Sequence, residues 1–206
     1  HKTVPKSYQI FFNEPLFLSI FCQVFQHNQF IDEKRLTYSL IFRLYIYFRN
    51  SIISEKVDED PHLNVTYKYL DKLANYSLYY KQCLDIPRNK ARHYANQFCR
   101  NRKWSESLLY WTLRENLLFE TQQDEDSVMF GFQKMGDFLI ADVFKRNKMS
   151  DEDKIHSIIE WSKQSSYRRF ISALLSDWDL TPKLLNKKID SIINKWNTNT
   201  EWTIEI

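Results

Sequence analysis

Apolar residues recur with a helical period along most of the chain, and only one short region has the pattern of β-strands. From residue 105 the inward positions are Leu108, Leu109, Thr112 and Leu113, which predicts a helix starting at Ser105. Two apolar and aromatic runs follow, at 116–120 and 128–132, on either side of a polar, acidic turn. Such a pattern predicts a β-hairpin. A second amphipathic helix comes directly after it, with apolar positions at Met135, Phe138, Leu139, Ala141, Val143 and Phe144. Helix, two-stranded wing and helix form the core of a winged-helix module.

The rest of the chain predicts further helices with short connections. They are expected over 14–27, 32–52, 64–80 and 87–98, and three more between 150 and 196. Ser150 and Asp153 have the spacing of a capping box, and Thr181-Pro182 is expected to open the last helix. An acidic stretch from Glu55 to Pro61 indicates a linker. We therefore expect three units, at 1–56, 57–148 and 149–206, in a mainly α fold that ends in the start of an α-helical bundle or solenoid.

Composition supports this fold class and narrows the environment. Two glycines and five prolines in 206 residues are too few for a strand-rich fold, which needs turn glycines. The three cysteines, Cys22, Cys83 and Cys99, are widely spaced and form no CxxC pair, so a zinc site or a disulfide framework is not expected. Reduced thiols are typical of a cytoplasmic protein. The apolar stretch 39–48 is interrupted by Arg43, so no membrane span is expected, and no signal peptide is visible.

Candidate chemistry is sparse in this sequence. No GxxxxGK[ST], GxGxxG, HExxH or GxSxG motif occurs, so no catalytic residue and no metal site is predicted. A net charge of +3 is too small to argue for a nucleic-acid or membrane partner. Arg100, Arg102 and Lys103 form a basic run, but the following helix, 105–115, has a net acidic balance. That balance favours a winged helix that packs on protein over one that reads DNA.

Both glycines of the chain lie within six positions of each other, at the junction of the wing and the next helix. Gly131 is expected to permit close packing in the wing, and Gly136 to let the helix lie against its neighbour. Asp137 is expected in the first turn of that helix, where a carboxylate interacts favourably with the helix dipole.

Two segments resemble a known family. Residues 13–22, NEPLFLSIFC, are similar to the segment that opens the helical lid domain of STAND NTPases, particularly the NACHT-related bacterial antiphage (AVAST-like) sensors. Residues 130–141, FGFQKMGDFLIA, are similar to a motif in the winged-helix domain of the same family. The order and separation of the two segments also agree. The resemblance makes 1–56 a helical lid domain, 57–148 a winged-helix domain and 149–206 the start of a C-terminal helical domain.

The resemblance also implies roles for individual residues. Pro15, beside Asn13, would pack against the adenine of a bound nucleotide, although Glu14 is one residue more than the family's Asn-Pro pair. Phe132 would occupy the position of a histidine that senses the nucleotide β-phosphate in many relatives. A phenyl ring cannot hydrogen-bond phosphate, so Gln133 and the neighbouring Lys134 are the polar candidates. Asp137 and Gly136 would be switch or latch residues.

The implied function is regulatory. The chain would be a fragment, consistent with its start at His1, that lies downstream of an ATPase core. It would hold ATP or ADP in the intact protein, with Mg bound outside the fragment, and no cofactor is expected for the fragment alone. The implied partners are the protein's own upstream core and downstream sensor domain, with oligomerisation on activation in antiviral defence. The alternative is a free-standing helical or winged-helix module that binds nucleic acid or a protein partner. An enzyme with its own active site ranks third.

Overall fold

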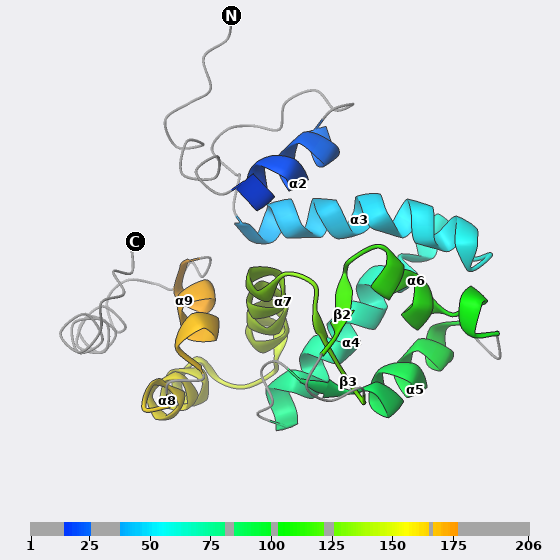
Figure 1. Ribbon diagram of the computed structural model, residues 1–206. Coiled ribbons are helices and arrows are strands. Elements are labelled where there is room, and N and C mark those ends of the chain that lie inside the picture. The colour runs from blue at the N-terminus through cyan, green and yellow to red at the C-terminus, as the bar shows by residue number, and fades with distance from the viewer. Residues whose placement is uncertain are drawn as a thin grey trace, which may run out of the picture.

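The structure, a computed structural model, describes residues 15–25, 38–80, 85–99, 103–121, 126–164 and 167–176 (Figure 1). Its α-helices are α2 (Pro15–Phe25), α3 (Tyr38–Lys56), α4 (Val65–Tyr80), α5 (Arg88–Phe98), α6 (Leu108–Arg114), α7 (Gln133–Arg146), α8 (Asp151–Ser162) and α9 (Arg168–Ser176). Two 3-10 helices, η2 (Pro61–Leu63) and η3 (Trp104–Glu106), and three strands, β1 (Ile86–Pro87), β2 (Leu118–Glu120) and β3 (Ser127–Phe130), complete the described elements. The predicted mainly α fold with a small β element is confirmed.

Helix α3 lies between α2 on one side and α4, α6 and α7 on the other (Figure 1). Pro15 is the first residue of α2, where its missing N–H has no helical partner to lose. The ring of Phe17 meets Phe42 of α3 edge-on, with centroids 5.2 Å apart. Arg49 of α3 donates to Gln23 Oε1 at 2.9 Å and to Glu115 Oε2 at 2.7 Å, which ties α2 to the end of α6.

The segment from α4 to β3 has the arrangement of a winged helix. Helix α4, strand β1, helices α5 and α6 and the hairpin β2–β3 follow one another, and the antiparallel sheet has the order β1-β3-β2. Val128 of the central strand pairs with Ile86 on one side and Glu120 on the other. The hairpin is therefore where the sequence predicts it, but β1 was not predicted. A two-residue strand that contains Pro87 is too short to show any alternation.

Several element boundaries differ from the prediction for local reasons. The helix expected from Ser105 begins instead at Leu108, because Ser107 is its N-cap and its Oγ accepts from the Tyr110 N–H at 3.2 Å. Helix α3 runs on to Lys56, so the linker expected from Glu55 is shorter than predicted. The chain turns just after it, with Asp58 in the left-handed region at φ 52°.

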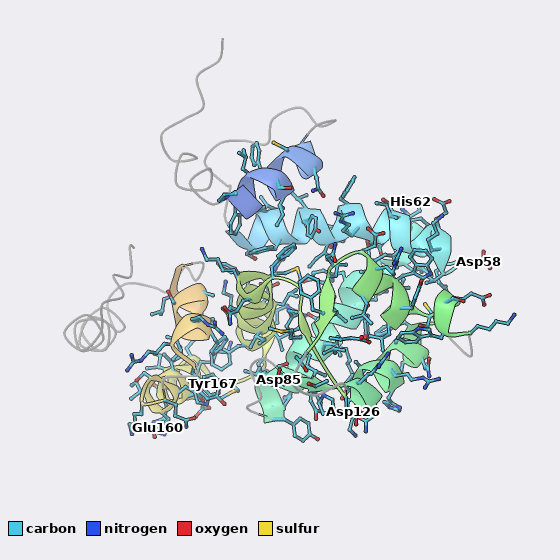
Figure 2. All side chains as sticks on the ribbon, viewed as in Figure 1. Asp58, His62, Asp85, Asp126, Glu160 and Tyr167 are labelled. Atoms are coloured by element: carbon cyan, nitrogen blue, oxygen red, sulfur yellow. The ribbon has the colours of Figure 1, made fainter. Side chains whose placement is uncertain are left out.

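The C-terminal helices lie against α7. Ser150 caps α8 by accepting from the Asp153 N–H at 3.1 Å, which confirms the predicted cap. Tyr167 stacks on Trp161 of α8 at 5.6 Å and leads into α9, which packs beside α7 (Figure 2). The helix expected from Thr181-Pro182 lies outside the described residues.

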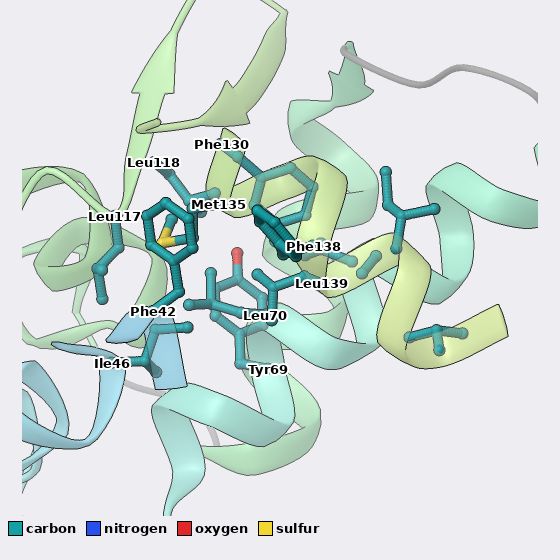
Figure 3. Close-up of a cluster of buried hydrophobic side chains, with 14 of the residues drawn as sticks. Phe42, Ile46, Tyr69, Leu70, Leu117, Leu118, Phe130, Met135, Phe138 and Leu139 are labelled. Carbon is teal, nitrogen blue, oxygen red and sulfur yellow. The ribbon is translucent and has the colours of Figure 1, made fainter. Parts of the chain in front are cut away.

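One continuous core joins all of these elements, from Phe17 of α2 to Leu174 of α9. Figure 3 shows its centre, where α3, α4, the wing and α7 meet. The residues labelled there are Phe42, Ile46, Tyr69, Leu70, Leu117, Leu118, Phe130, Met135, Phe138 and Leu139. Tyr69 is fully buried, which raises the pKa of its hydroxyl, and that hydroxyl donates to the Ala91 carbonyl at 3.2 Å. The hydrogen bond holds α5 on α4.

Both glycines lie at positions where neighbouring parts of the chain approach closely, as expected. A Cβ on Gly131 would lie 1.9 Å from the backbone carbonyl oxygen of Asn116, at the end of α6. A Cβ on Gly136 would lie 2.7 Å from Phe130 Cδ2, a side-chain atom. The Gly131 contact is with the main chain at the end of α6, whereas the Gly136 contact lets α7 approach the Phe130 side chain of the wing.

This difference gives the first prediction. Gly131→Ala should lower the free energy of unfolding by about 2–3 kcal/mol, because the backbone must move to relieve the overlap. Gly136→Ala should cost about 1 kcal/mol or less, because the Phe130 ring can shift and alanine gains helix propensity. Urea denaturation of both variants measures the two costs, and equal costs would contradict the packing described here.

Candidate functional site at helix α7

Helix α7 brings together most of the residues that the sequence singles out. Ten successive residues, Met135 to Phe144, are buried, so the helix is covered on nearly every side. A helix buried all round belongs in the centre of a fold rather than on its surface. Helices α3, α4 and α9 and strand β3 provide the cover.

The N-terminal end of α7 lies near the start of α2. Phe132 occupies the N-cap position in an extended conformation and makes no side-chain capping hydrogen bond. Its ring packs against Tyr45 of α3, with centroids 5.9 Å apart. Gln133 and Lys134 follow and are exposed. The ammonium group of Lys134 lies 5.5 Å from the centre of the Phe17 ring, a cation–π contact between α7 and α2.

Three of the residues that the resemblance implies to be near the nucleotide, Pro15, Phe132 and Gln133, thus lie at the same edge of the molecule. Pro15 is exposed at the start of α2, two residues before Phe17. Phe132 and Gln133 lie at the start of α7, and the contact between the two helices runs through Phe17 and Lys134. Asn13 lies outside the described residues. The edge offers exposed polar groups and the first-turn N–H groups of α7, which are suited to an anion.

Asp137 lies one turn later in helix α7 than the sequence predicts. Helix α7 begins at Gln133, so Asp137 is its fifth residue and lies in the second turn; the first turn holds no acidic residue. The expectation of a first-turn residue favoured by the helix dipole is therefore wrong. The helix begins directly after residue 132, as predicted, so the position within it was misjudged.

The surroundings of Asp137 are those of a weakly compensated buried charge. Its side chain is 7% exposed, and its nearest described cation is Arg169 of α9, with Nε 3.8 Å from Oδ2. The Arg169 side chain is 46% exposed. Burial raises the pKa of Asp137 to about 6, and the charge of Arg169 lowers it only in part. The ionised carboxylate therefore carries a desolvation cost that Arg169 offsets only in part.

A second acidic residue of α7 is compensated far better. Asp142 forms an ion pair with Arg43 of α3, and the Tyr67 hydroxyl of α4 donates to Asp142 Oδ2 at 3.4 Å. One turn later Arg146 pairs with Asp71 of α4. Sequence reasoning missed these pairs because their partners are 75 to 99 residues apart. An acid within the apolar run FLIADVF was the available signal, since a buried carboxylate needs a partner.

The arrangement joins segments that are far apart in the chain. The part of the chain that the structure describes holds no cluster of three or more His, Cys, Asp or Glu side chains that could bind a metal ion. Within the same residues, no helix has both the length and the apolar character needed to cross a membrane. Of the cysteines in the described residues, Cys22 is exposed and Cys99 is buried, and both are free thiols.

Comparison with known protein families, with curated proteins and with solved structures found no match to this chain.

The raised pKa of Asp137 predicts a specific pH dependence. Between about pH 4 and 6 the folded chain keeps a proton that the unfolded chain releases, so the contribution of Asp137 to stability falls as the pH rises through this range. Asp137→Asn removes the charge. The free energy of unfolding of Asp137→Asn minus that of the parent chain should therefore be larger at pH 7 than at pH 4, by on the order of 2–3 kcal/mol.

Glu160→Gln is the matched control for that measurement. A hydrogen bond and the charge of Lys163 lower the pKa of exposed Glu160, so its contribution has the opposite sign. The difference between Glu160→Gln and the parent should stay flat or become more negative as the pH rises. If the Asp137→Asn difference is the same at pH 4 and pH 7, Asp137 is not a destabilising buried charge.

Proposed function

We propose that this chain is the regulatory lid and winged-helix region of a STAND-type ATPase, which holds nucleotide and couples ligand sensing to activation in antiviral defence. One observation supports this most directly. A single helix, α7, contacts the lid through Phe17, the winged helix through Asp71, and the downstream helices through Arg169. A change at either end of the chain can therefore act on the other end through one rigid element.

The contact between α7 and α9 is the element proposed to have two states. In the closed state Asp137 is buried and only partly compensated by Arg169. When α9 leaves, water reaches the carboxylate and its desolvation cost disappears. Ionised Asp137 thus favours the open state and Arg169 the closed state. In this proposal Asp137 is a switch residue that keeps the closed state marginal, rather than a latch that strengthens it.

The nucleotide would lie at the edge formed by Pro15, Phe132 and Gln133, between this chain and an upstream ATPase core. Gln133, Lys134 and the N–H groups at the start of α7 can face phosphate oxygens, whereas Phe132 can offer only an apolar surface. Mg would be bound by the upstream core. The proposed partners are that core and a downstream sensor, in a cytoplasmic protein that oligomerises on activation.

The reading frame upstream of His1 distinguishes this proposal from a free-standing helical or winged-helix module. A GxxxxGK[ST] motif within about 300 residues, the span of one or two domains, is the expected result. Its absence would leave the free-standing module as the better proposal.

A second test concerns nucleotide binding by the 206-residue chain itself. Because the phosphate-binding loop lies in the proposed upstream core, calorimetry should detect only weak binding of ATP or ADP or none. A micromolar dissociation constant requires about 8 kcal/mol, which one apolar contact at Pro15 cannot supply. Micromolar binding would contradict the assignment of the phosphate site to another part of the protein.

The switch itself is tested by opposite effects of its two partners. In the full-length protein Arg169→Gln should raise ATP turnover without trigger by about two- to fivefold, the amount expected for an exposed partner. Asp137→Asn should lower it, by up to about thirtyfold, because the closed state no longer buries a charge. In the Asp137→Asn background Arg169→Gln should have no effect, because Arg169 then has no charge to compensate.

Asp71→Asn and Arg146→Gln are the matched controls, since they break an ion pair between α4 and α7 within the winged helix. They should lower stability without a directional change in turnover. If Asp137→Asn raises basal turnover, Asp137 is a latch and the switch described here is wrong.

A further inference from the structure

The positive charge of this chain is concentrated in one segment. Residues 86–105 contain six Lys and Arg and no Asp or Glu, whereas the other 186 residues carry three more acidic than basic side chains. The segment therefore supplies all of the net charge of +3. Its six cations are Arg88, Lys90, Arg92, Arg100, Arg102 and Lys103. Such an asymmetry is the electrostatic footprint of a polyanionic partner.

The structure shows how helix α5 presents part of this charge. Ala91 and Ala95 face the core. The exposed residues are Asn89, Lys90, Arg92, His93, Asn96 and Gln97. This face has no acidic and no apolar residue, and its side chains are those that contact phosphates and bases in nucleic-acid complexes. Lys90 and Arg92 make no ion pair with any residue that the structure describes.

The wing does not extend this face. Arg88 pairs with Glu120 of β2, Nη2 to Oε1 at 2.8 Å, and its N–H donates to the Asp126 carbonyl at 2.5 Å. Asp85 and Asp126 lie at this end of α5 (Figure 2). The acidic wing therefore neutralises the start of α5 and would repel phosphates. A winged helix that binds a duplex holds it between a recognition helix and a basic wing. Here the wing is acidic, and the basic residues lie on α5 instead of α6.

An exposed aromatic ring lies beside the basic face. Trp104 is 41% exposed, and the Arg88 guanidinium carbon lies 5.1 Å from the centre of its ring. Arg92 follows Arg88 by four residues and so lies on the same side of α5. The exposed ring therefore lies on the side of α5 that carries Arg92, which has no ion pair with any described residue. A cation near an exposed aromatic ring is a combination that binds single strands, whose phosphates need cations and whose unstacked bases need a flat partner.

We propose that the exposed face of α5, with Trp104 at its edge, binds single-stranded nucleic acid. Lys90 and Arg92 contact phosphates, Asn96 and Gln97 offer amide groups to the strand, and Trp104 stacks on a base. The sequence argues against a nucleic-acid partner because the expected recognition helix, 105–115, has a net acidic balance. The basic residues lie on the helix before it. This inference does not depend on the proposed ATPase role.

The experiment measures fluorescence anisotropy of a labelled twenty-nucleotide oligo-dT with the 206-residue chain, at salt concentrations from about 50 to 200 mM. The chain should bind, and the double variant Lys90→Gln, Arg92→Gln should bind about tenfold or more weakly at the lowest salt. The slope of log K against log salt should fall in magnitude by about 1.4, since each lost phosphate contact removes about 0.7 on single strands. Trp104→Ala should weaken binding by about tenfold with no change in that slope.

The matched control is Lys56→Gln with Lys148→Gln, which removes the same charge from exposed positions away from α5. It should bind within about twofold of the parent chain. Ultraviolet cross-linking of the parent chain to the oligonucleotide should mark peptides between 88 and 104, which keeps the test independent of any variant's folding. Absence of binding, equal weakening by the control, or adducts elsewhere would overturn the proposal. Tighter binding of a duplex, or equal competition by poly-glutamate, would overturn the single-strand assignment.

Discussion

The burial of two carboxylates on one central helix is the constraint on which the rest of this structure depends. Helix α7 is buried along ten successive residues, and Asp137 and Asp142 are among them. A buried charge is costly unless a partner compensates it, so the elements around α7 must bring cations to these two positions. Arg43 of α3 and Arg169 of α9 are those cations, and the two pairs join α3 and α9 to α7.

The two carboxylates of α7 are compensated unequally. Asp142 has an ion pair and a tyrosine hydroxyl, from two different helices. Asp137 has one half-exposed arginine at 3.8 Å and keeps a raised pKa. The charge pair between α7 and α9 is therefore weaker than the pairs that join α7 to α3 and α4. The proposed regulatory role would use this difference, because segments that move are drawn from the less stable part of a fold.

Local patterns predicted most of this fold, and non-local contacts account for what they missed. The hairpin, the Ser150 cap and the close packing of Gly131 and Gly136 depend on short sequence windows or on the rarity of glycine, and all were predicted. The pairing of β1 with β3 and the pair Arg43–Asp142 join residues far apart in sequence, and no single window contains both partners.

The candidate site was only partly predictable for the same reason. The 130–141 motif drew attention to α7, but Asp137 was assigned to the first turn of this helix, whereas it lies in the second. Its partner Arg169 lies in another helix and has no signature of its own. The sequence shows that α5 carries basic residues. Only the structure shows that Ala91 and Ala95 face inward, so that the basic residues form an exposed face.

Native-state hydrogen exchange, resolved by residue, tests the central position of α7 most directly. Amides between Gly136 and Phe144 should exchange only through global unfolding, with the largest free energy of opening in the chain. Amides of α9 should open at a lower free energy, and that free energy should rise when the pH is lowered from 7 to 5, as Asp137 takes up its proton. Exchange of α7 at a lower free energy than α9, or no effect of pH on α9, would contradict this account.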